Sequence, residues 1–384
     1  MLHEFSFMSF PNLEYLDLSL NDLFDAIPPQ ISSLSKLIYL DMSYNQFSGI
    51  SPPEIGHLKN LEVLHLNENQ LNGSIPQETG HLQFLYELAL FANYLEGPIP
   101  ASLGHLNNLT SLYLHENQLS GSIPASLGNL HNLASLYLQE NQLSGSIPPS
   151  LGTIPKDIGN LNLMVDLELA INQLSGSIPA SIGNLSNLEF LFLRDNQLSG
   201  PIPQEMGDLM KLTTLQLDTN NFVGYLPQLK YLRWCPIPKS LNSCKSSVRI
   251  RVEGNNLTGN ISDVLDAYPN LQFIDLSHNN FYGEVSHIWG QCLHLATLRM
   301  AGSNLTGSIP PEIGNATQIH ELDLSSNRLV GVIPKEFGKL SSLNQIPLKL
   351  NYLNLSKNKF SQEIPFQFGN LVHLFQLDLS YNSL

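Results

Sequence analysis

Apolar and polar positions alternate along this chain in a pattern that recurs every 24 residues over most of its length. In the stretch 109–130, which reads LTSLYLHENQLSGSIPASLGNL, Leu112 and Leu114 alternate with more polar neighbours. Such alternation predicts a short strand with one buried face. Gly121 permits a turn that a Cβ would resist, and Ile123-Pro124 begins an extended segment with a fixed φ.

An asparagine follows each predicted strand, at a bend where its amide can satisfy backbone groups that a tight coil would leave unpaired. These positions are Asn21, Asn45, Asn69, Asn93, Asn117, Asn141, Asn172, Asn196, Asn220, Asn255, Asn279, Ser303 (the one exception), Asn327, Asn358 and Asn382, and eleven of the fourteen intervals are 24 residues. One unit cannot bury its leucines alone, so stacked units must share a core. We therefore predict an α/β-class, right-handed solenoid with a concave parallel β-sheet and a convex side of 3-10 or extended segments.

Composition agrees with a repeat and excludes several functions. The chain has 72 Leu and 38 Asn among 384 residues, and its net charge of −15 argues against a nucleic acid partner. It has no run of 18 apolar residues that would span a membrane, and residues 1–12 do not form a secretory signal peptide. We find no kinase motif and no metal-binding spacing, so we expect no catalysis, metal or cofactor in this chain.

The repeat, with its Leu-x-Gly-x-Ile-Pro segment, resembles the plant-type leucine-rich repeat from Phe10 to Leu384. The stretches 281–292 and 314–327 are similar to ectodomains of the male-discoverer-interacting receptor-like kinase group. This resemblance implies an ectodomain at the extracellular side of the plasma membrane that binds a secreted peptide or protein, with a leucine-rich repeat co-receptor kinase as a possible partner. A membrane helix and a cytosolic Ser/Thr kinase would follow. A standalone, truncated receptor-like or inhibitor-like binding protein and a non-functional gene fragment are the alternatives.

Three intervals of the asparagine series are longer than 24 residues, with irregular sequence at 149–163, 225–247 and 339–350. Each gap looks like two units from which part of one has been removed. These segments are either loops or extended convex segments that bulge from the solenoid, or the result of damaged gene structure. In either case we predict a single domain over 1–384 with about 15 units.

The predicted concave positions carry unusual side chains in units three to ten, where other units have the sequence Asp-Leu-Ser. We expect ligand contacts from His65, Phe91, Tyr113, His115, Tyr137, Phe192, Arg194 and Asp218. Exposed aromatic side chains on a rigid sheet give a large contact area at low entropy cost, so we expect a peptide along this face, anchored by Tyr113, Tyr137 and Phe192. The alternative is that the rings only stack on one another across neighbouring strands.

Arg249 and Arg251 alternate with Ile250, so both guanidinium groups are expected on one face of a strand, an arrangement that suits a carboxylate. The pair is similar to the Arg-x-Arg pairs with which several plant peptide receptors bind the free C-terminus of their ligand. The resemblance therefore adds Arg249 and Arg251 to the expected ligand-binding residues.

Eight Asn-x-Ser/Thr sequons occur, and secretion would make them candidates for glycosylation. We expect acceptors at Asn72, Asn108, Asn184, Asn256, Asn260, Asn304 and Asn315, whereas Asn354 is least plausible because it falls on a strand face. Of the three cysteines, Cys235 and Cys244 could pair in a secreted chain, which would leave Cys292 buried and inert.

Overall fold

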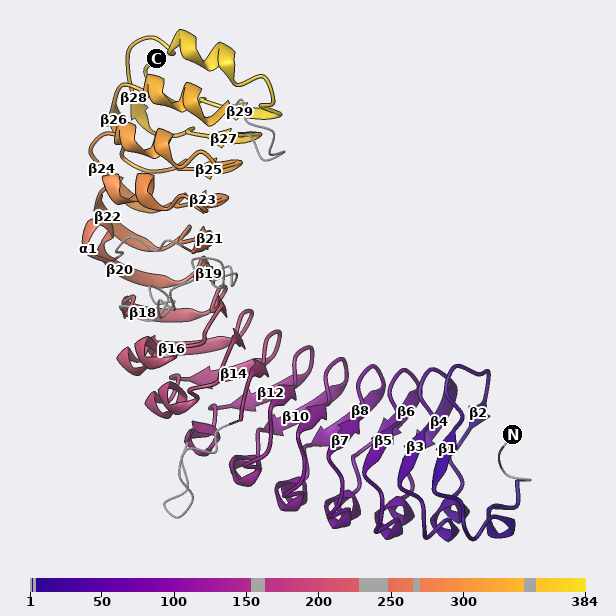
Figure 1. The fold of residues 1–384 in the computed structure, drawn as a ribbon. Helices are drawn as coiled ribbons and strands as arrows, with labels where there is room; N and C mark the ends of the chain where they lie inside the picture. Colours follow the sequence, from indigo (N-terminus) through magenta and orange to yellow (C-terminus); the bar gives the residue numbers. More distant parts are fainter. Residues whose placement is uncertain (1, 3–4, 153–162, 228–247, 265–269, 342–349) are drawn as a thin grey trace, which may run out of the picture. The chain divides into compact units, whose positions relative to one another are not determined.

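The computed structural model describes residues 2, 5–152, 163–227, 248–264, 270–341 and 350–384. The chain divides into two compact units, Met1–Leu198 (unit 1) and Ser199–Leu384 (unit 2). Each unit is a stack of coils (Figure 1), and we describe each by itself.

In unit 1 every coil contributes one short strand to a parallel sheet, the first sheet. Its strands lie in chain order: β1 (Tyr15–Asp17), β3 (Tyr39–Asp41), β5 (Val63–His65), β7 (Glu87–Ala89), β9 (Ser111–Tyr113), β11 (Ser135–Tyr137), β13 (Asp166–Glu168) and β15 (Phe190–Phe192). Equivalent positions pair directly, as Leu112 does with Leu136. The central leucines of β3 to β15 are buried, which confirms the predicted core, whereas Leu16 of the first strand is half-buried.

A second parallel sheet in unit 1 was not expected from the sequence, which predicted only an extended return. It contains β2 (Phe24–Asp25), β4 (Gln46–Ile50), β6 (Gln70–Gly73), β8 (Tyr94–Pro98), β10 (Gln118–Ser122), β12 (Gln142–Gly145), β14 (Gln173–Gly176) and β16 (Gln197–Pro201), within which the boundary between the units falls. These strands begin just after the asparagines and pass through the Leu-x-Gly segment. Stacking of the coils brings the extended segments within hydrogen-bonding distance of one another.

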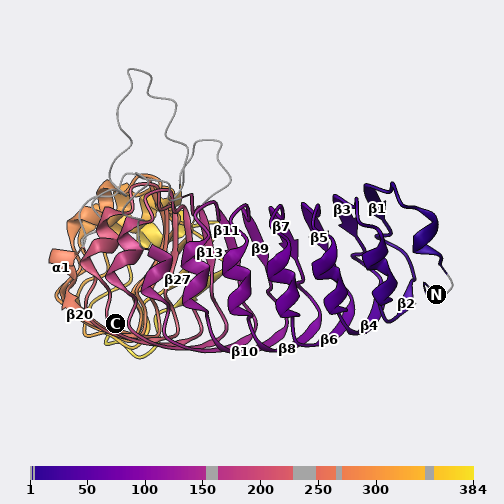
Figure 2. The same ribbon diagram turned by 90° about the horizontal axis from the view of Figure 1, so that it is seen from below.

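Short 3-10 helices form the third part of each coil, as predicted, and stand in a row along unit 1 (Figure 2). They are η2 (Phe7–Ser9), η3 (Pro29–Ser33), η4 (Pro53–His57), η5 (Gln77–His81), η6 (Ala101–His105), η7 (Ala125–Asn129), η8 (Pro149–Gly152) and η9 (Ala180–Asn184). Neighbouring helices approach closely: a Cβ at Gly104 in η6 would clash with the carbonyl oxygen of Ser126 in η7. Close packing of the coils therefore explains this glycine.

Unit 2 has the same plan. Its first sheet holds β17 (Thr214–Gln216), β19 (Val248–Arg251), β21 (Leu271–Asp275), β23 (Thr297–Arg299), β25 (Glu321–Asp323), β27 (Tyr352–Asn354) and β29 (Gln376–Asp378). Opposite lie β18 (Asn221–Tyr225), β20 (Asn256–Asn260), β22 (Asn280–Glu284) and β24 (Asn304–Thr306), and separately β26 (Val330–Gly331) with β28 (Lys359–Phe360). The helices are η10 (Gln204–Asp208), α1 (Ile261–Val264), η12 (His287–Gln291), η13 (Pro311–Asn315), η14 (Lys335–Ser341) and η15 (Phe366–Asn370). None of the described helices is long and apolar enough to cross a lipid bilayer.

The three long intervals do not interrupt the first sheets. Strand β11 pairs directly with β13, β17 with β19, and β25 with β27. The pairing of strands in the first sheets is therefore continuous across all three intervals. Most of the irregular segments (153–162, 228–247 and 342–349) lie outside the described residues, as do Cys235 and Cys244.

The asparagine series performs the role predicted for it. The side-chain amide of Asn69 donates to the carbonyl oxygens of Met42, Leu66 and Asn67 at 3.0–3.1 Å. Its oxygen accepts from the backbone nitrogen of Phe47 at 3.0 Å, so one buried side chain satisfies four backbone groups in two coils. The residue before it, Glu68, has φ 53°, in the left-handed region that the bend requires.

Candidate functional site

The outer face of the first sheet of unit 1, formed by the side chains that point away from the core, carries most of the expected ligand-binding residues. His65, Tyr113, Tyr137 and Phe192 end strands β5, β9, β11 and β15, and the side chains are half-buried. Phe91, His115 and Arg194 lie two residues after the ends of their strands, on the same face, and are also half-buried. The alternation of buried leucines with these residues places them there.

Four of these side chains form one cluster across β7, β9 and β11, which we call the aromatic cluster: Phe91, Tyr113, His115 and Tyr137. Phe91 stacks on His115 with ring centroids 4.4 Å apart, and Tyr113 meets Tyr137 edge to face at 5.1 Å. The cross-strand stacking that we gave as an alternative is thus present. The rings nevertheless keep part of their surface in solvent.

Phe192 is not part of the aromatic cluster, because strand β13 lies between β11 and β15. Its ring is 6.4 Å from that of Phe190, at an interplanar angle of 15°. The guanidinium of the neighbouring Arg194 forms an ion pair with Asp195, with 2.5 Å between Nη1 and Oδ2. The three expected anchors therefore form two aromatic groups on either side of β13.

Strand β13 contributes two carboxylates, Asp166 and Glu168, that were not among the expected site residues. The Tyr137 hydroxyl donates a 2.6 Å hydrogen bond to Asp166 Oδ2. Burial raises the pKa of Asp166, and this hydrogen bond opposes the rise. Burial and the nearby charge of Asp166 raise the pKa of Glu168 to about 7, while Arg194 opposes that rise. Asp166 and Glu168 precede Asn172 by the same numbers of residues as Ser111 and Tyr113 precede Asn117. The spacing of the repeat could therefore have identified both carboxylates as outward-facing.

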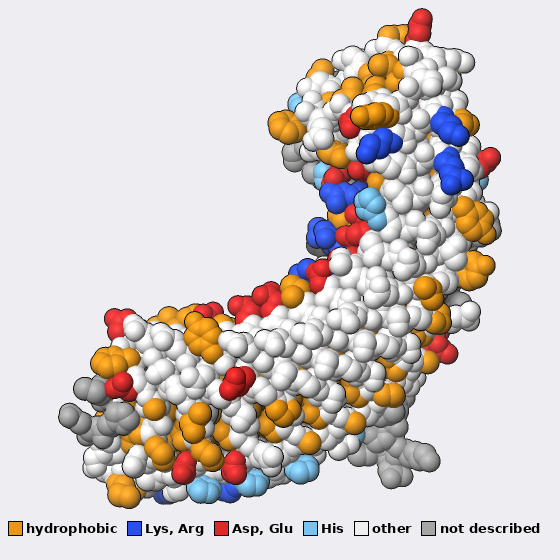
Figure 3. All heavy atoms as spheres, turned by 180° about the vertical axis from the view of Figure 1, so that it is seen from behind, with side chains coloured by type: hydrophobic (Ala, Val, Ile, Leu, Met, Phe, Trp, Pro, Cys, Tyr) orange, Lys and Arg blue, Asp and Glu red, His pale blue; other side chains and the backbone are white. Residues whose placement is uncertain are grey.

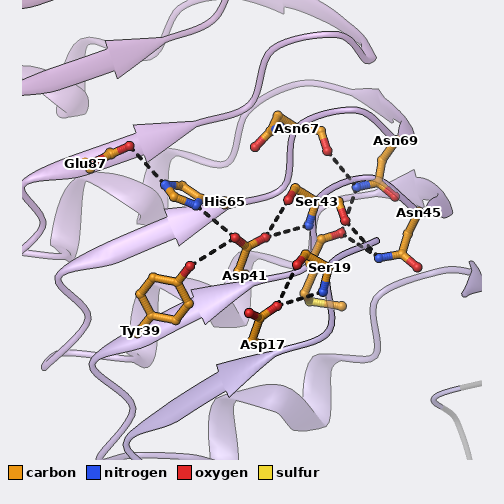
Figure 4. A network of polar contacts seen from close by, with 11 residues as sticks. Asp17, Ser19, Tyr39, Asp41, Ser43, Asn45, His65, Asn67, Asn69 and Glu87 are labelled. Carbon is orange, nitrogen blue, oxygen red and sulfur yellow. Dashed lines mark hydrogen bonds and ion pairs between the residues drawn. The ribbon is translucent and has the colours of Figure 1, made fainter. Parts of the chain in front are cut away.

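His65 is the centre of a separate polar network on β3, β5 and β7 (Figure 4). Its two ring nitrogens lie 3.1 Å from Asp41 Oδ2 and 3.1 Å from Glu87 Oε1, and Tyr39 donates to Asp41 at 3.0 Å. Burial disfavours the charged imidazole, but these two carboxylates outweigh burial and raise the pKa of His65. Because three strands share the network, His65 has a structural role in addition to the contact role expected for it.

The charges are distributed unequally along the chain. Residues 1–198 contain 19 of the 33 acidic residues but only 4 of the 18 basic residues, whereas residues 199–384 contain 14 of each. On the face drawn in Figure 3, most of the Lys and Arg side chains lie over unit 2. Unit 1 therefore carries the whole net negative charge and favours cationic groups in a partner.

In unit 2, Arg249 and Arg251 lie on the same face of β19, as predicted, with Ile250 buried between them. Arg249 is exposed, whereas Arg251 lies 4.7 Å from the centre of the Phe273 ring and 3.9 Å from Glu253. One strand thus carries two guanidinium groups on one face, of which Arg249 is exposed and Arg251 already contacts a ring and a carboxylate.

Asp218, also expected to bind ligand, is only 6% exposed. The expectation that it lines an accessible surface is wrong, because the residue is buried. The charge of Asp218 affects a neighbouring carboxyl. Burial, the charge of Asp275 and the charge of Asp218 together raise the pKa of Glu253 to about 7.

Five of the seven sequon asparagines are exposed: Asn72, Asn108, Asn184, Asn256 and Asn315. Asn260 and Asn304 are half-buried. The Asn354 side-chain oxygen accepts hydrogen bonds from the backbone and hydroxyl of Ser356. Cys292 is buried, as expected.

The described residues contain no group of three or more His, Cys, Asp or Glu side chains that could hold a metal ion. A hollow of about 330 Å³ lies away from the outer face, against Ile50, Pro53, Pro76, Pro98 and Pro100 among others. It brings together no acid–base or nucleophilic pair, so the outer face remains the candidate site.

Comparison with family models matches residues 2–146 to a leucine-rich repeat region. A leucine-rich repeat model also matches 132–161, 187–209, 270–292, 318–340 and 349–371. Comparison with curated proteins finds no match.

Several solved structures are similar along almost the whole chain. The plant peptide hormone receptor RGFR1 in complex with RGF2 is 34% identical with a TM-score of 0.87, over 98% of this chain and 56% of that chain. The ectodomain of GASSHO1/SCHENGEN3 from Arabidopsis thaliana, in complex with CASPARIAN STRIP INTEGRITY FACTOR 2, is 34% identical with a TM-score of 0.69, over 96% and 50%. The Arabidopsis receptor kinase HAESA, in complex with the peptide hormone IDA and the co-receptor SERK1, is 30% identical with a TM-score of 0.63, over 98% and 71%. The chain thus spans about half the length of the first two.

Proposed function

The chain belongs to the leucine-rich repeat family and shares the fold of plant receptor ectodomains, and from this premise we propose that it is a peptide-binding part of such an ectodomain. It recognises its ligand and catalyses no reaction. The proposed binding surface in unit 1 is the outer face of the first sheet, from Phe91 to Arg194.

The aromatic cluster is the observation that carries this proposal. Tyr113 and Tyr137 lie on adjacent parallel strands with their rings in contact, and both rings are half-buried beside Phe91 and His115. Amphipathic rings that are ordered before binding lose little entropy when a ligand covers them. An extended peptide fits a row of short strands, because successive side chains of the peptide can contact successive coils.

The solved relatives support the same class of ligand, since those receptors are bound to RGF2 and to IDA. The HAESA complex also contains the co-receptor SERK1, which supports a leucine-rich repeat co-receptor kinase as a second partner here. We extend the proposal to the whole protein: a plant receptor-like Ser/Thr kinase of the male-discoverer-interacting group, with its repeats glycosylated at the extracellular side of the plasma membrane.

Arg249 and Arg251 are proposed to bind a free carboxylate of the ligand, such as its C-terminus. Arg249 is exposed and Arg251 is held over Phe273, so one guanidinium is free to move and the other is pre-positioned. A ligand amidated at its C-terminus should bind at least tenfold more weakly than the free acid. Equal affinities would contradict this role.

The experiment selects short peptides from a random displayed library on the full chain and measures the affinity of one selected peptide. Tyr113→Ala and Phe192→Ala should each weaken binding about tenfold or more, as expected for central aromatic contacts. The matched control is Tyr94→Ala, because Tyr94 is 56% exposed on β8 of the second sheet. Selected peptides that bind all three variants as tightly as the natural chain would contradict the proposed surface.

A further inference from the structure

Glu168 lies between two aromatic side chains in the first sheet of unit 1. In the register of the strands Tyr137 is paired with Glu168, and Glu168 is paired with Phe192. Side chains at paired positions of adjacent parallel strands point to the same face, with backbones about 4.8 Å apart. A half-buried carboxylate therefore has an aromatic side chain on either side of it.

The Glu168 carboxylate receives no hydrogen bond and no ion pair from the part of the chain that the structure describes. The two neighbouring donors that could have satisfied it are already engaged: the Tyr137 hydroxyl donates to Asp166, and the Arg194 guanidinium is paired with Asp195. A charge that is partly desolvated and has no partner is unfavourable. A cation from outside the chain would compensate it.

Other buried polar atoms around this position also have no hydrogen-bond partner among the described residues. They are Asp166 Oδ1 on the same strand, His115 Nδ1, and Gln139 Oε1 just after β11. Buried polar atoms are normally satisfied, and such exceptions are often found where a ligand completes a site. These atoms are independent of Glu168 and lie on the same side of the sheet.

We propose that Tyr137, Glu168 and Phe192 form a binding site for a basic side chain, lysine or arginine, of the peptide ligand. The inference rests on the proposed function and specifies the chemistry of the ligand. The carboxylate forms a charge-assisted hydrogen bond with the cation, and the two ring faces add cation–π attraction. The excess of acidic residues in unit 1 favours the approach of such a ligand.

Proton release should accompany binding. Burial and Asp166 raise the pKa of Glu168 to about 7, so much of this carboxyl is protonated below neutral pH in the free protein. The charged group just after β15 is Arg194, which opposes the rise, and β11 contributes the neutral Tyr137. A cation stabilises the ionised form, so affinity for a basic peptide should increase as the pH rises from 5 to 8.

The experiment uses the peptides selected on the full chain and asks first whether lysine or arginine recurs at one position. Glu168→Gln, which keeps the shape of the side chain, should then weaken binding of such a peptide about tenfold and remove the pH dependence. Replacing the basic residue of the peptide with norleucine should weaken binding to the natural chain by a similar factor. The same replacement should have little effect on binding to Glu168→Gln, because the interaction is already absent.

Glu96→Gln is the matched control, because it removes one negative charge from an exposed residue of the second sheet. It should leave affinity unchanged. Peptides that depend on Tyr113 but have no basic residue and bind Glu168→Gln normally would overturn this inference and leave the proposed function intact. If Tyr113→Ala, Phe192→Ala and Glu168→Gln all leave the affinity for the selected peptides unchanged, both this inference and the proposed function are overturned.

Discussion

The hydroxyl of Tyr137 donates a hydrogen bond of 2.6 Å to Oδ2 of Asp166, although 29 residues separate them in the sequence. The bond joins β11 to β13 across one of the long intervals. Burial and the bond to Asp166 raise the pKa of Tyr137, so the phenol stays neutral and remains a donor.

Removing this donor should destabilise unit 1. In Tyr137→Phe, Asp166 loses its hydrogen bond, so we expect the free energy of unfolding at pH 7 to fall by about 1–2 kcal/mol. The loss should be smaller at pH 3, where the carboxyl is protonated. Urea unfolding at both pH values measures the effect. Tyr113→Phe removes a hydroxyl with no such bond and should change stability little; equal losses in the two variants would show that the bond is unimportant.

Replacing Glu168 should have the opposite effect. A carboxyl whose folded pKa is raised from 4.5 to about 7 destabilises the fold when it ionises, so the penalty is absent below pH 4.5 and grows as the pH rises to 7. We expect Glu168→Gln to stabilise the chain by about 1 kcal/mol at pH 8, a figure reduced for partial exposure, and not at pH 4. Thermal unfolding at the two pH values tests this, with Glu96→Gln as control. A stabilisation that is the same at both would contradict the assigned cause.

The His65 network should stabilise the fold most in acid. Its folded pKa is raised above the ordinary value of 6.5, so the stabilisation is complete below that value and is lost as the pH rises through the folded pKa. His65→Gln should therefore cost about 1 kcal/mol more at pH 5.5 than at pH 9. Urea midpoints give the difference. His105→Gln, at an exposed histidine at the end of η6, is the control substitution.

The asparagine series allows a comparison within the chain. Asn69→Ala removes four backbone contacts in a buried site and should lower the free energy of unfolding by about 3–5 kcal/mol. Asn21 is exposed, and among the described residues its amide donates only to Leu18 and Ser19, so Asn21→Ala should cost less than half as much. Equal costs for the two substitutions would mean that bonds between coils contribute little.

Glycine packing between helices gives a further pair. In Gly104→Ala the new methyl group would meet the backbone of Ser126, so η6 and η7 must separate, at a cost of about 2 kcal/mol or more. Gly369 in η15 has no neighbouring atom within 4 Å of the position that a Cβ would occupy, so Gly369→Ala should be neutral or slightly stabilising. Calorimetry measures the melting temperature of both variants. A loss for Gly104→Ala alone would show that helix packing requires its glycine, and equal losses would point to backbone conformation instead.

Most of the fold could be predicted because it repeats. The spacing of leucines around Asn117 determines which side chains are buried, and the amide of each asparagine has only nearby backbone groups to satisfy. The second sheet could not be inferred in the same way, because its hydrogen bonds join different coils. Whether the extended segment from Gln118 to Ser122 pairs with its neighbours depends on how closely the coils stack.

The site was predictable in part. Tyr113 and Tyr137 were found because they interrupt a polar lining. Glu168 was not among the expected residues because carboxylates are common on this face. Only its aromatic neighbours, and the absence of a hydrogen bond to its carboxylate from the described residues, distinguish it. The burial of Asp218 is not visible in the spacing, because that spacing places it with the outward-facing residues.

Strand pairing across the long interval between β11 and β13 has a consequence for how such a surface can change over time. Four residues occupy paired positions on the consecutive strands β9, β11, β13 and β15: Tyr113, Tyr137, Glu168 and Phe192. Their separations in the sequence are 24, 31 and 24 residues. A ligand on this face would contact them in the order of the strands, whatever the length of the chain that connects two neighbouring strands. Insertions in that connection can therefore accumulate without changing which side chains are neighbours on the face that a ligand would contact.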